Sequence, residues 1–381
     1  MRRVLIVSYG GKSMVKSLER NSWSLLGLLF DAITMQQAVE LVNDAIDNQQ
    51  RCFLSTPNLN FAITCQQDVE FYQSVVDSDL SIADGMPLIW IAKLLGVPIK
   101  ERVAGSSLFE QLYSTPRTEK IKVFFFGGEK GIAERALEQL NADSVGMMGC
   151  GFYDPGFVSI DEMSTPEVID KINATQPDFL VIALGAKKGQ AWIQHNRHQL
   201  NASVISHLGA VINFVAGSIE RAPELWQRLG MEWLWRIRQE PSLWRRYFFD
   251  GLALVKVLLL KVFPLAIYDR LLKHTTDYQL TIELSLHKTD ITLVNLGGSA
   301  RYAILEKIQL MFLEVLEQDS QDGVELNCAK LRYIDSGFIA SLLLFQRDLN
   351  EQGRQVCLSK LPSRIKRLLM LNNMLNRFQY K

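Results

Sequence analysis

Residues 28–207 alternate short apolar segments with helical patterns, and the apolar segments end at glycines or polar residues. The clearest are Lys122–Phe126, which runs into Gly127-Gly128, and Asp178–Leu184, which runs into Gly185. Strands that are apolar along their whole length are typical of a parallel sheet with helices on both faces. The sequence therefore predicts an α/β fold with a Rossmann-like, mostly parallel sheet.

The residues at the ends of these segments are the first candidates for a site, because ligands of open α/β sheets bind at the carboxyl ends of the strands. These candidates are Thr56, Asn58, Asp84, Arg102, Gly127, Gly128 and Gly185. Taken singly, Thr56, Asn58 and Arg102 carry little information, since a turn and a surface arginine would explain them.

Asp84 follows a segment that is otherwise mostly apolar. A carboxylate in a partly dehydrated cleft can have a raised pKa and act as a base. The alternative is a turn or helix-capping aspartate, because Asp-Gly pairs are common in turns. Gly127-Gly128 also has two interpretations. Its backbone N–H groups can face a phosphate, or the pair can simply form a tight turn.

Residues 207–247 combine tryptophans with arginines. An apolar, strand-like run passes through Gly209 and Gly217, and a helical pattern follows Pro223. The arginines of this helical stretch and its continuation are Arg228, Arg236, Arg238, Arg245 and Arg246. Such a segment suits an anionic membrane surface or a diphosphate, which a guanidinium can bind with two hydrogen bonds. A core helix with a solvated basic face is the alternative.

The composition excludes several classes of protein. The formal net charge is zero, which argues against a nucleic-acid partner. The five cysteines are scattered without a CxxC pair, so the sequence predicts no disulfide framework and no zinc site, and it fits a reducing cytoplasm. We expect neither a metal nor another cofactor.

The most apolar stretch is Phe248–Leu272, but Lys256, Lys261 and Pro264 interrupt it. A membrane-spanning helix needs about 20 nearly uncharged residues, so we expect a buried or interfacial helix here. At the other end of the chain, residues 1–24 show no clear period and are expected to form a leader.

The pattern changes after about residue 273. Two alternating segments predict paired strands, and further helices and strands follow to the end of the chain. We therefore predict four parts: a leader at 1–24, a first domain at 25–247, an apolar helical linker at 248–274 and a second domain at 275–381.

Taken together, several segments of the first domain resemble the WecG/TagA/CpsF glycosyltransferases, glycosyltransferase family 26. The matching segments, in the family's order, are Ser55-Thr-Pro-Asn58, Ile82-Ala-Asp-Gly-Met86, Glu101-Arg-Val-Ala-Gly-Ser106, Phe125-Phe-Gly-Gly-Glu129, Gly149-Cys-Gly-Phe-Tyr153, Pro177-Asp-Phe-Leu-Val181 and 217–247. Within the last of these, Arg221-Ala-Pro-Glu, Glu232-Trp and Glu240-Pro form the most specific signature.

The resemblance implies an inverting transferase. It would move an N-acetylmannosamine-type sugar from a UDP donor to a polyprenyl-diphosphate-linked amino sugar, at the inner face of the cell membrane. It also implies that Asp84 is the general base, that Thr56 and Asn58 line the sugar pocket, and that Arg102 faces the diphosphate or the acceptor. The remaining substrate-binding candidates are Gly127, Gly128, Gly185, Gln190, Arg221, Arg236, Arg245 and Arg246.

The chain departs from the family pattern at a few positions. Gly189 stands where the family has a glutamine that is expected to touch the substrate, and Gln190 is a possible substitute. Asn213 stands where an aspartate is common. Both departures slightly favour an alternative function, a non-catalytic scaffold or regulator with a degenerate transferase domain.

The second domain resembles a STAS domain, as found in anti-sigma-factor antagonists. The segment Leu331-Arg-Tyr-Ile-Asp335-Ser336-Gly337 lies at the expected strand-to-helix turn. Ser336 is a candidate for phosphorylation, although a helix-capping serine is the simpler interpretation. The resemblance implies that this domain regulates the enzyme or docks it to a protein partner. The whole sequence thus predicts a cytoplasmic, membrane-peripheral glycosyltransferase of polysaccharide biosynthesis.

Overall fold

The computed structural model describes residues 17–381 except 224, 227–229, 276–279, 287–290 and 319–322. The described chain forms two compact units. The first, here called the transferase unit after the family that its sequence resembles, comprises Ile33–Ile89 and Lys100–Gly251. The second, here the STAS unit, comprises residues 17–32, Trp90–Ile99 and Leu252–Lys381. The domain boundaries expected from the sequence stay a prediction.

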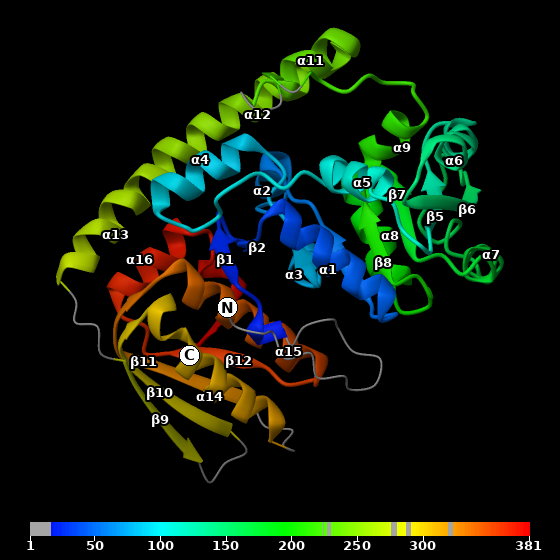
Figure 1. Cartoon of the computed structure of the whole chain (residues 1–381). Coiled ribbons are helices and arrows are strands. Elements are labelled where there is room, and N and C mark those ends of the chain that lie inside the picture. Colours follow the sequence, from blue (N-terminus) through cyan, green and yellow to red (C-terminus); the bar gives the residue numbers. More distant parts are fainter. Residues whose placement is uncertain (1–16, 224, 227–229, 276–279, 287–290, 319–322) are drawn as a thin grey trace. The chain divides into compact units, whose positions relative to one another are not determined.

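A six-stranded sheet forms the centre of the transferase unit (Figure 1). Its order is β4-β3-β8-β7-β5-β6, and every neighbouring pair is parallel. The strands are β3 (Cys52–Ser55), β4 (Leu80–Ser81), β5 (Ile121–Gly127), β6 (Met147–Tyr153), β7 (Phe179–Ala183) and β8 (Val204–His207). The predicted α/β fold with a mostly parallel sheet is confirmed.

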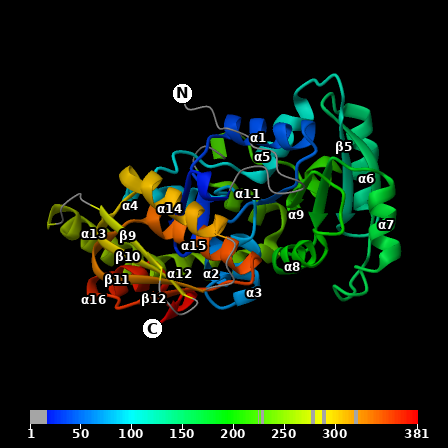
Figure 2. The same cartoon turned by 90° about the horizontal axis from the view of Figure 1, so that it is seen from below.

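Alternate residues of the central strands face two separate apolar cores. Val123 and Phe125 of β5 point into one core, and Phe124 and Phe126 point into the other. Helices cover both faces, and Figures 1 and 2 both show α6 beside β5 and β6. The helices of this unit are α1 (Met35–Asp47), α2 (Leu59–Thr64), α3 (Val69–Val76), α5 (Gly105–Ser114), α6 (Ile132–Asp143), α7 (Pro166–Ala174), α8 (Ala186–Asn196), α9 (Gly209–Val215) and α11 (Glu232–Gln239).

The segment after β8 differs from the prediction. The apolar run that begins at His207 was expected to be strand-like, but its residues from Gly209 to Val215 form the helix α9. A short buried apolar run fits a strand and a helix equally well by periodicity. The helix predicted after Pro223 is not continuous: Leu225 and Trp226 are helical, Gly230 lies in a turn with a φ of 72°, and a separate helix, α11, begins at Glu232. Arg228 lies outside the described residues.

The STAS unit contains a five-stranded sheet of order β13-β12-β11-β10-β9. The predicted pairing of the first two strands is confirmed: β9 (Leu280–Leu286) runs antiparallel to β10 (Ile291–Ala300). The other pairs are parallel. The remaining elements are η4 (Tyr302–Ile304), α14 (Leu305–Glu317), β11 (Gly323–Ile334), α15 (Ser336–Glu351), β12 (Val356–Ser359), α16 (Ser363–Leu371), η5 (Leu375–Arg377) and β13 (Gln379–Tyr380).

Residues 17–32 also belong to the STAS unit. They form η1 (Ser17–Glu19) and an antiparallel hairpin of β1 (Ser22–Leu25) and β2 (Leu28–Asp31). The helical turn η1 contacts α14 and α15, and the strand β1 contacts α15. The earlier residues of the expected leader, 1–16, lie outside the described residues.

A long helical stretch spans the predicted apolar linker. It consists of η2 (Pro241–Leu243), α12 (Trp244–Val257), the π-helical turn η3 (Leu258–Val262) and α13 (Phe263–Thr275). Residues Pro241–Leu272 are long and apolar enough to cross a membrane by length and composition, and only 22% of the most apolar window is buried. This low burial does not fit a core helix, and the interfacial position expected from the sequence stays a prediction. The helix α4 (Met86–Leu95) is also apolar.

Candidate active site

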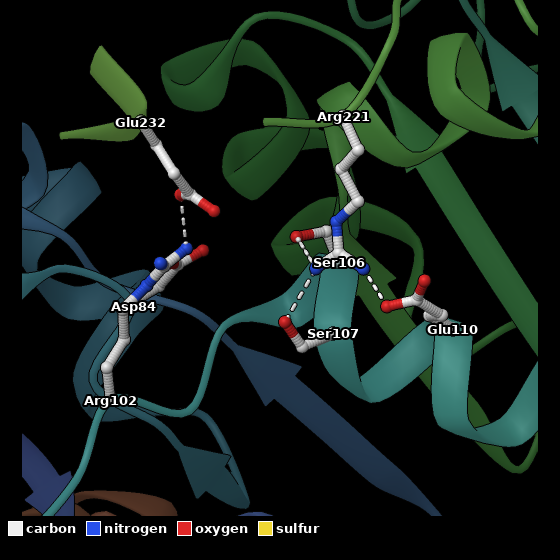
Figure 3. A network of polar contacts seen from close by, with 7 residues as sticks. All are labelled: Asp84, Arg102, Ser106, Ser107, Glu110, Arg221 and Glu232. Atoms are coloured by element: carbon white, nitrogen blue, oxygen red, sulfur yellow. Dashed lines mark hydrogen bonds and ion pairs between the residues drawn. The ribbon is translucent and has the colours of Figure 1, made fainter. Parts of the chain in front are cut away.

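Asp84 lies three residues beyond the end of β4, at the carboxyl edge of the sheet. Its backbone N–H donates to the carbonyl of Pro57 at 3.0 Å, which places it beside the Thr56–Asn58 turn that follows β3. Its carboxylate accepts a hydrogen bond from Nε of Arg102 at 3.3 Å (Figure 3). The structure therefore brings together three of the predicted strand-end segments.

Arg102 joins two acidic side chains that are far apart in the sequence. Besides Asp84, its Nη2 donates to Oε2 of Glu232 at 2.6 Å, from the first residue of α11. The Arg102 side chain is only 16% exposed, and those of Asp84 and Glu232 are about a quarter exposed, at 27% and 26%. The basic helical segment that follows Pro223 up to residue 247, here called the basic appendage, is thus bonded to the sheet edge through a partly dehydrated ion-pair network.

The network shifts the pKa of Asp84. Burial is the largest cause and raises this pKa, the charge of Arg102 lowers it, and the negative charge of Glu232 raises it again. The backbone N–H of Gly105, at the start of α5, lowers it slightly. The net result is a pKa above the ordinary value of an aspartate, which suits a group that must accept a proton.

Arg221 forms the second arm of the site. Its Nη2 donates to Oγ of Ser107 at 2.6 Å and to Oγ of Ser106 at 3.4 Å, and its guanidinium pairs with Glu110 (Figure 3). Burial lowers the pKa of Arg221, while the charges of nearby Glu232 and Asp84 raise it. Arg221 therefore lies within electrostatic reach of the Asp84 network.

Gly105 permits the close packing of this edge. A Cβ atom on Gly105 would come within 2.4 Å of Leu208 and 2.9 Å of Thr56. Thr56 itself is buried, at 7% exposure, and Asn58 caps α2 by accepting a hydrogen bond from the N–H of Phe61 at 3.1 Å. Thr56 and Asn58 are thus held in place at one side of the site. Their roles toward a sugar stay predictions.

The paired glycines after β5 have a local explanation. Gly127 and Gly128 both have positive φ angles, 92° and 94°. The N–H of Gly128 donates to the carbonyl of Ala183 at 2.8 Å, and a Cβ on Gly127 would come within 2.8 Å of the same carbonyl. These contacts favour the tight-turn alternative. Gly185, in contrast, is the N-cap residue of α8, and a Cβ atom added there would meet no other atom within 4 Å.

The arginines of the appendage have separate surroundings. Arg236 lies over the ring of Phe214 at 5.8 Å, whereas Arg245 lies over its neighbour Trp244 at 5.7 Å. Arg246 is 53% exposed and lies 3.9 Å from Asp250. The structure does not bring Arg245 and Arg246 to the Asp84 network, so their role in binding UDP stays a prediction.

Sequence reasoning missed the role of several residues here. Glu232 was noted only as part of a signature, and Ser107 and Glu110 were not considered. Their partners lie more than 100 positions away in the sequence, and Glu232 follows Arg102 by 130 positions. Spacing alone cannot reveal such pairs, and the only available signal was the match of Glu232-Trp to a known pattern.

The comparisons with known proteins show the family of this chain. The model of the glycosyl transferase WecG/TagA/CpsF family matches residues 23–266, more than half of the chain. The chain belongs to this family. It is therefore a glycosyltransferase, as the sequence predicted, and the scaffold alternative is not favoured.

Several relatives of this transferase carry the name N-acetylglucosaminyldiphosphoundecaprenol N-acetyl-beta-D-mannosaminyltransferase. The one from Bacillus spizizenii is 30% identical over 201 residues, which cover 53% of this chain and 76% of the relative. The one from Bacillus subtilis is 24% identical and covers 53% and 77%. The one from Staphylococcus aureus is 25% identical over 227 residues, covering 58% and 85%.

The C-terminal part matches a STAS domain model over residues 272–376, which confirms the predicted second domain. A solved structure, that of the anti-sigma factor antagonist SpoIIAA in its unphosphorylated form, is similar over 26% of this chain and 87% of that one. The identity is 14% and the TM-score 0.23.

The turn before α15 corrects one expectation. Asp335, not Ser336, is the capping residue of this helix, since its carboxylate accepts a hydrogen bond from the N–H of Phe338 at 2.9 Å. Ser336 is the first residue of the helix and is partly exposed. The interpretation of Ser336 as a cap was therefore wrong, and its phosphorylation stays a prediction.

The departure at Gly189 has a steric reason. A Cβ atom there would come within 2.3 Å of the His207 ring, whose Nε2 lies 2.6 Å from the Leu184 carbonyl. Burial lowers the pKa of His207, whereas the hydrogen bond with the Leu184 carbonyl raises it. The neighbouring Gln190 is 1% exposed and donates to Oγ of Ser55 at 3.3 Å.

This packing makes a prediction about stability. The change Gly189→Ala should lower the free energy of unfolding of the transferase by about 1–3 kcal/mol, because the added methyl overlaps the His207 ring. In the His207→Ala background the same change should cost much less, since the ring is gone. Thermal denaturation of the unaltered protein, the two single variants and the double variant measures the coupling free energy between the two positions. Equal costs in the two backgrounds would show that the two positions do not interact.

Proposed function

We propose that this transferase moves an N-acetylmannosamine-type sugar from a UDP donor to an N-acetylglucosamine unit on a polyprenyl diphosphate, with inversion at the sugar carbon. The names of the relatives support the sugar and the acceptor. The observation that carries the proposal is Asp84, a carboxylate with a raised pKa that shares Arg102 with Glu232 at the carboxyl edge of the sheet.

Asp84 is the proposed general base. Its carboxylate takes the proton from an acceptor hydroxyl while that oxygen forms a bond to the anomeric carbon of the donor sugar. The bond between this carbon and the UDP oxygen breaks, and UDP leaves with the electron pair. An attack on the face opposite to UDP inverts the configuration, so base and leaving group lie on opposite sides of the sugar.

The arginines are proposed to balance the charge that develops on UDP. Arg102, however, is bonded to Asp84 itself, so it is proposed to face the acceptor on the side of the base. Arg221 is bonded to Glu110 and to serine hydroxyls and is a candidate for the UDP side. A diphosphate carries more than one negative charge, and its hydrogen bonds with a guanidinium group are shorter than those with a neutral hydroxyl. Further candidates for this contact are Arg236, which lies over the ring of Phe214 on α9, and Arg245 and Arg246. Fixed positive charge at a leaving group lowers the barrier to its departure.

One prediction of this proposal concerns the general base. The variant Asp84→Asn should lose acceptor-dependent UDP release by about 10²–10⁴-fold, because an amide cannot accept the proton. The measurement is UDP release from UDP-N-acetylmannosamine with a polyprenyl-diphosphate N-acetylglucosamine acceptor in vesicles. Asp161→Asn, at an exposed aspartate of the same unit, is the matched control and should keep full activity. An active Asp84→Asn variant would remove the proposed base.

A second prediction concerns pH. Asp84 must be ionised to act, so kcat/KM rises with pH through its raised pKa. The variant Glu232→Gln removes a negative charge that raises this pKa, while the new amide oxygen still accepts from Arg102. The acidic limb of the kcat/KM profile should therefore move to lower pH. An unchanged limb, or one that moves to higher pH, would contradict the assignment of the limb to Asp84.

We also propose that the enzyme lies on the inner face of the cell membrane through the α12–α13 helical stretch. Large apolar side chains stand exposed along it at three- or four-residue steps: Phe248, Leu252, Val255, Leu259, Phe263, Ile267 and Leu271. The exposed Trp244, Arg245 and Arg246 precede this stripe. An apolar stripe with aromatic and basic residues at its start is typical of a helix that lies in a membrane interface. A membrane position also brings the enzyme to its lipid-linked acceptor.

This proposal predicts the behaviour on vesicles. The double variant Leu252→Asp, Leu259→Asp should lose binding to anionic vesicles in a flotation assay, because it places two charges in the stripe. Leu310→Asp is the control, since Leu310 is 61% exposed on α14, outside the stripe. An alkaline carbonate wash should release the unaltered enzyme from membranes. Resistance to that wash would indicate a spanning helix instead of a peripheral one.

The STAS domain is proposed to regulate the transferase or to dock it to a protein partner. The match to the domain model supports a role in protein interaction. The structure allows this role to be made more specific.

A further inference from the structure

Residues 17–32 precede the transferase unit in the sequence but fold with the STAS unit. Every residue of the hairpin from Ser22 to Asp31 is buried, including both polar ends. Its β1 strand contacts α15. A two-stranded hairpin is at best marginally stable in water by itself. This hairpin therefore depends on the surface that it covers.

The open end of the hairpin is anchored by Tyr302, which begins η4 before α14. The rings of Trp23 and Tyr302 lie 4.4 Å apart, and the Tyr302 hydroxyl donates to Oδ1 of Asn21 at 2.7 Å. The backbone N–H of Tyr302 donates to Asp335 at 2.7 Å, and a Cβ on Gly337 would come within 2.9 Å of its ring. The hairpin thus contacts the side chain that packs on the turn before α15.

The tip of the hairpin fits the end of α16. Leu26 and Gly27 both have positive φ angles, 56° and 92°, as two-residue hairpin turns require. Such a backbone is unusual for leucine, so its neighbours must hold it. Nδ2 of Asn373 donates to the Leu26 carbonyl at 3.4 Å, and a Cβ on Gly27 would lie 3.2 Å from that of Asn373.

A buried ion pair ties the two ends of the hairpin together. Nη2 of Arg20 lies 2.7 Å from Oδ2 of Asp31, and both side chains are 5% exposed. Oγ of Ser22 donates to the same carboxylate at 2.7 Å. A buried ion pair lowers the stability of a protein unless its hydrogen bonds are complete. Because Arg20, Ser22 and Asp31 complete them together, the pair favours the one arrangement in which the apolar residues of the hairpin lie against the STAS domain.

We propose that the face formed by η4, α14, α15 and the end of α16 is a binding site for an apolar β-hairpin, and that residues 17–32 of the same chain occupy it. The STAS domain then has a partner within its own chain, and another protein can use this face only after the hairpin leaves. The proposal rests on contacts inside the STAS unit and is independent of the proposed sugar transfer.

The test uses the full chain with a protease recognition sequence inserted between Ala32 and Ile33, where no helix or strand is interrupted. After cleavage under native conditions, the fragment that ends at Ala32 should still elute with the rest of the protein in size-exclusion chromatography. In the Leu29→Asp variant the fragment should be lost, because Leu29 is fully buried. The exposed Glu19→Gln change is the matched control and should retain it.

A second measurement keeps the proposal falsifiable if Leu29→Asp disturbs folding. The cleaved Leu29→Asp protein, freed of its fragment, should bind a fluorescent peptide of residues 17–32, whereas the uncleaved, unsubstituted chain should not. Separation of the unsubstituted fragment after cleavage would overturn the proposal, as would a freed face that does not bind the peptide. UDP release by the uncleaved chains reports on the transferase separately.

Discussion

The ion pairs of Arg102 connect the parts of the transferase unit that carry its chemistry. A carboxylate at the edge of a parallel sheet loses much of its hydration, and its ionised form then needs a fixed positive charge nearby. Arg102 supplies this charge to Asp84 and also binds Glu232. Without Glu232, α11 would lack its bond to the sheet edge. Without Arg102, two partly buried carboxylates would face each other, which is unfavourable for both.

The sequence predicted the central sheet well because apolar strands in a parallel sheet carry a strong local signal. The residue pattern predicts a strand at Val204–His207 and a helix at Ser363–Leu371, and β8 and α16 have these bounds. The edge strand β6 was missed, since Gly149, Cys150 and Gly151 interrupt its apolar pattern. The helix α9 was taken for a strand because a buried face of Val211 and Ile212 looks the same in both.

The site was less predictable than the fold. Strand ends can be found from the sequence, so Asp84, Thr56 and Arg102 were proposed as neighbours before the structure showed them at one edge. The partners of Arg102 and Arg221 depend on how distant segments fold back, and no local pattern encodes this. At Gly189 the structure adds what the sequence alone does not give: the His207 ring leaves no room for a side chain there.

The N-terminal hairpin has a consequence for the synthesis of the chain. Its partner Tyr302 lies 281 residues after Asn21. At roughly 5–20 residues per second, the ribosome needs tens of seconds to reach the helices on which the hairpin packs. During that time the leucines around Gly27 have no native surface to cover. The nascent chain therefore carries an apolar segment without its native surface while the whole transferase unit is being synthesised.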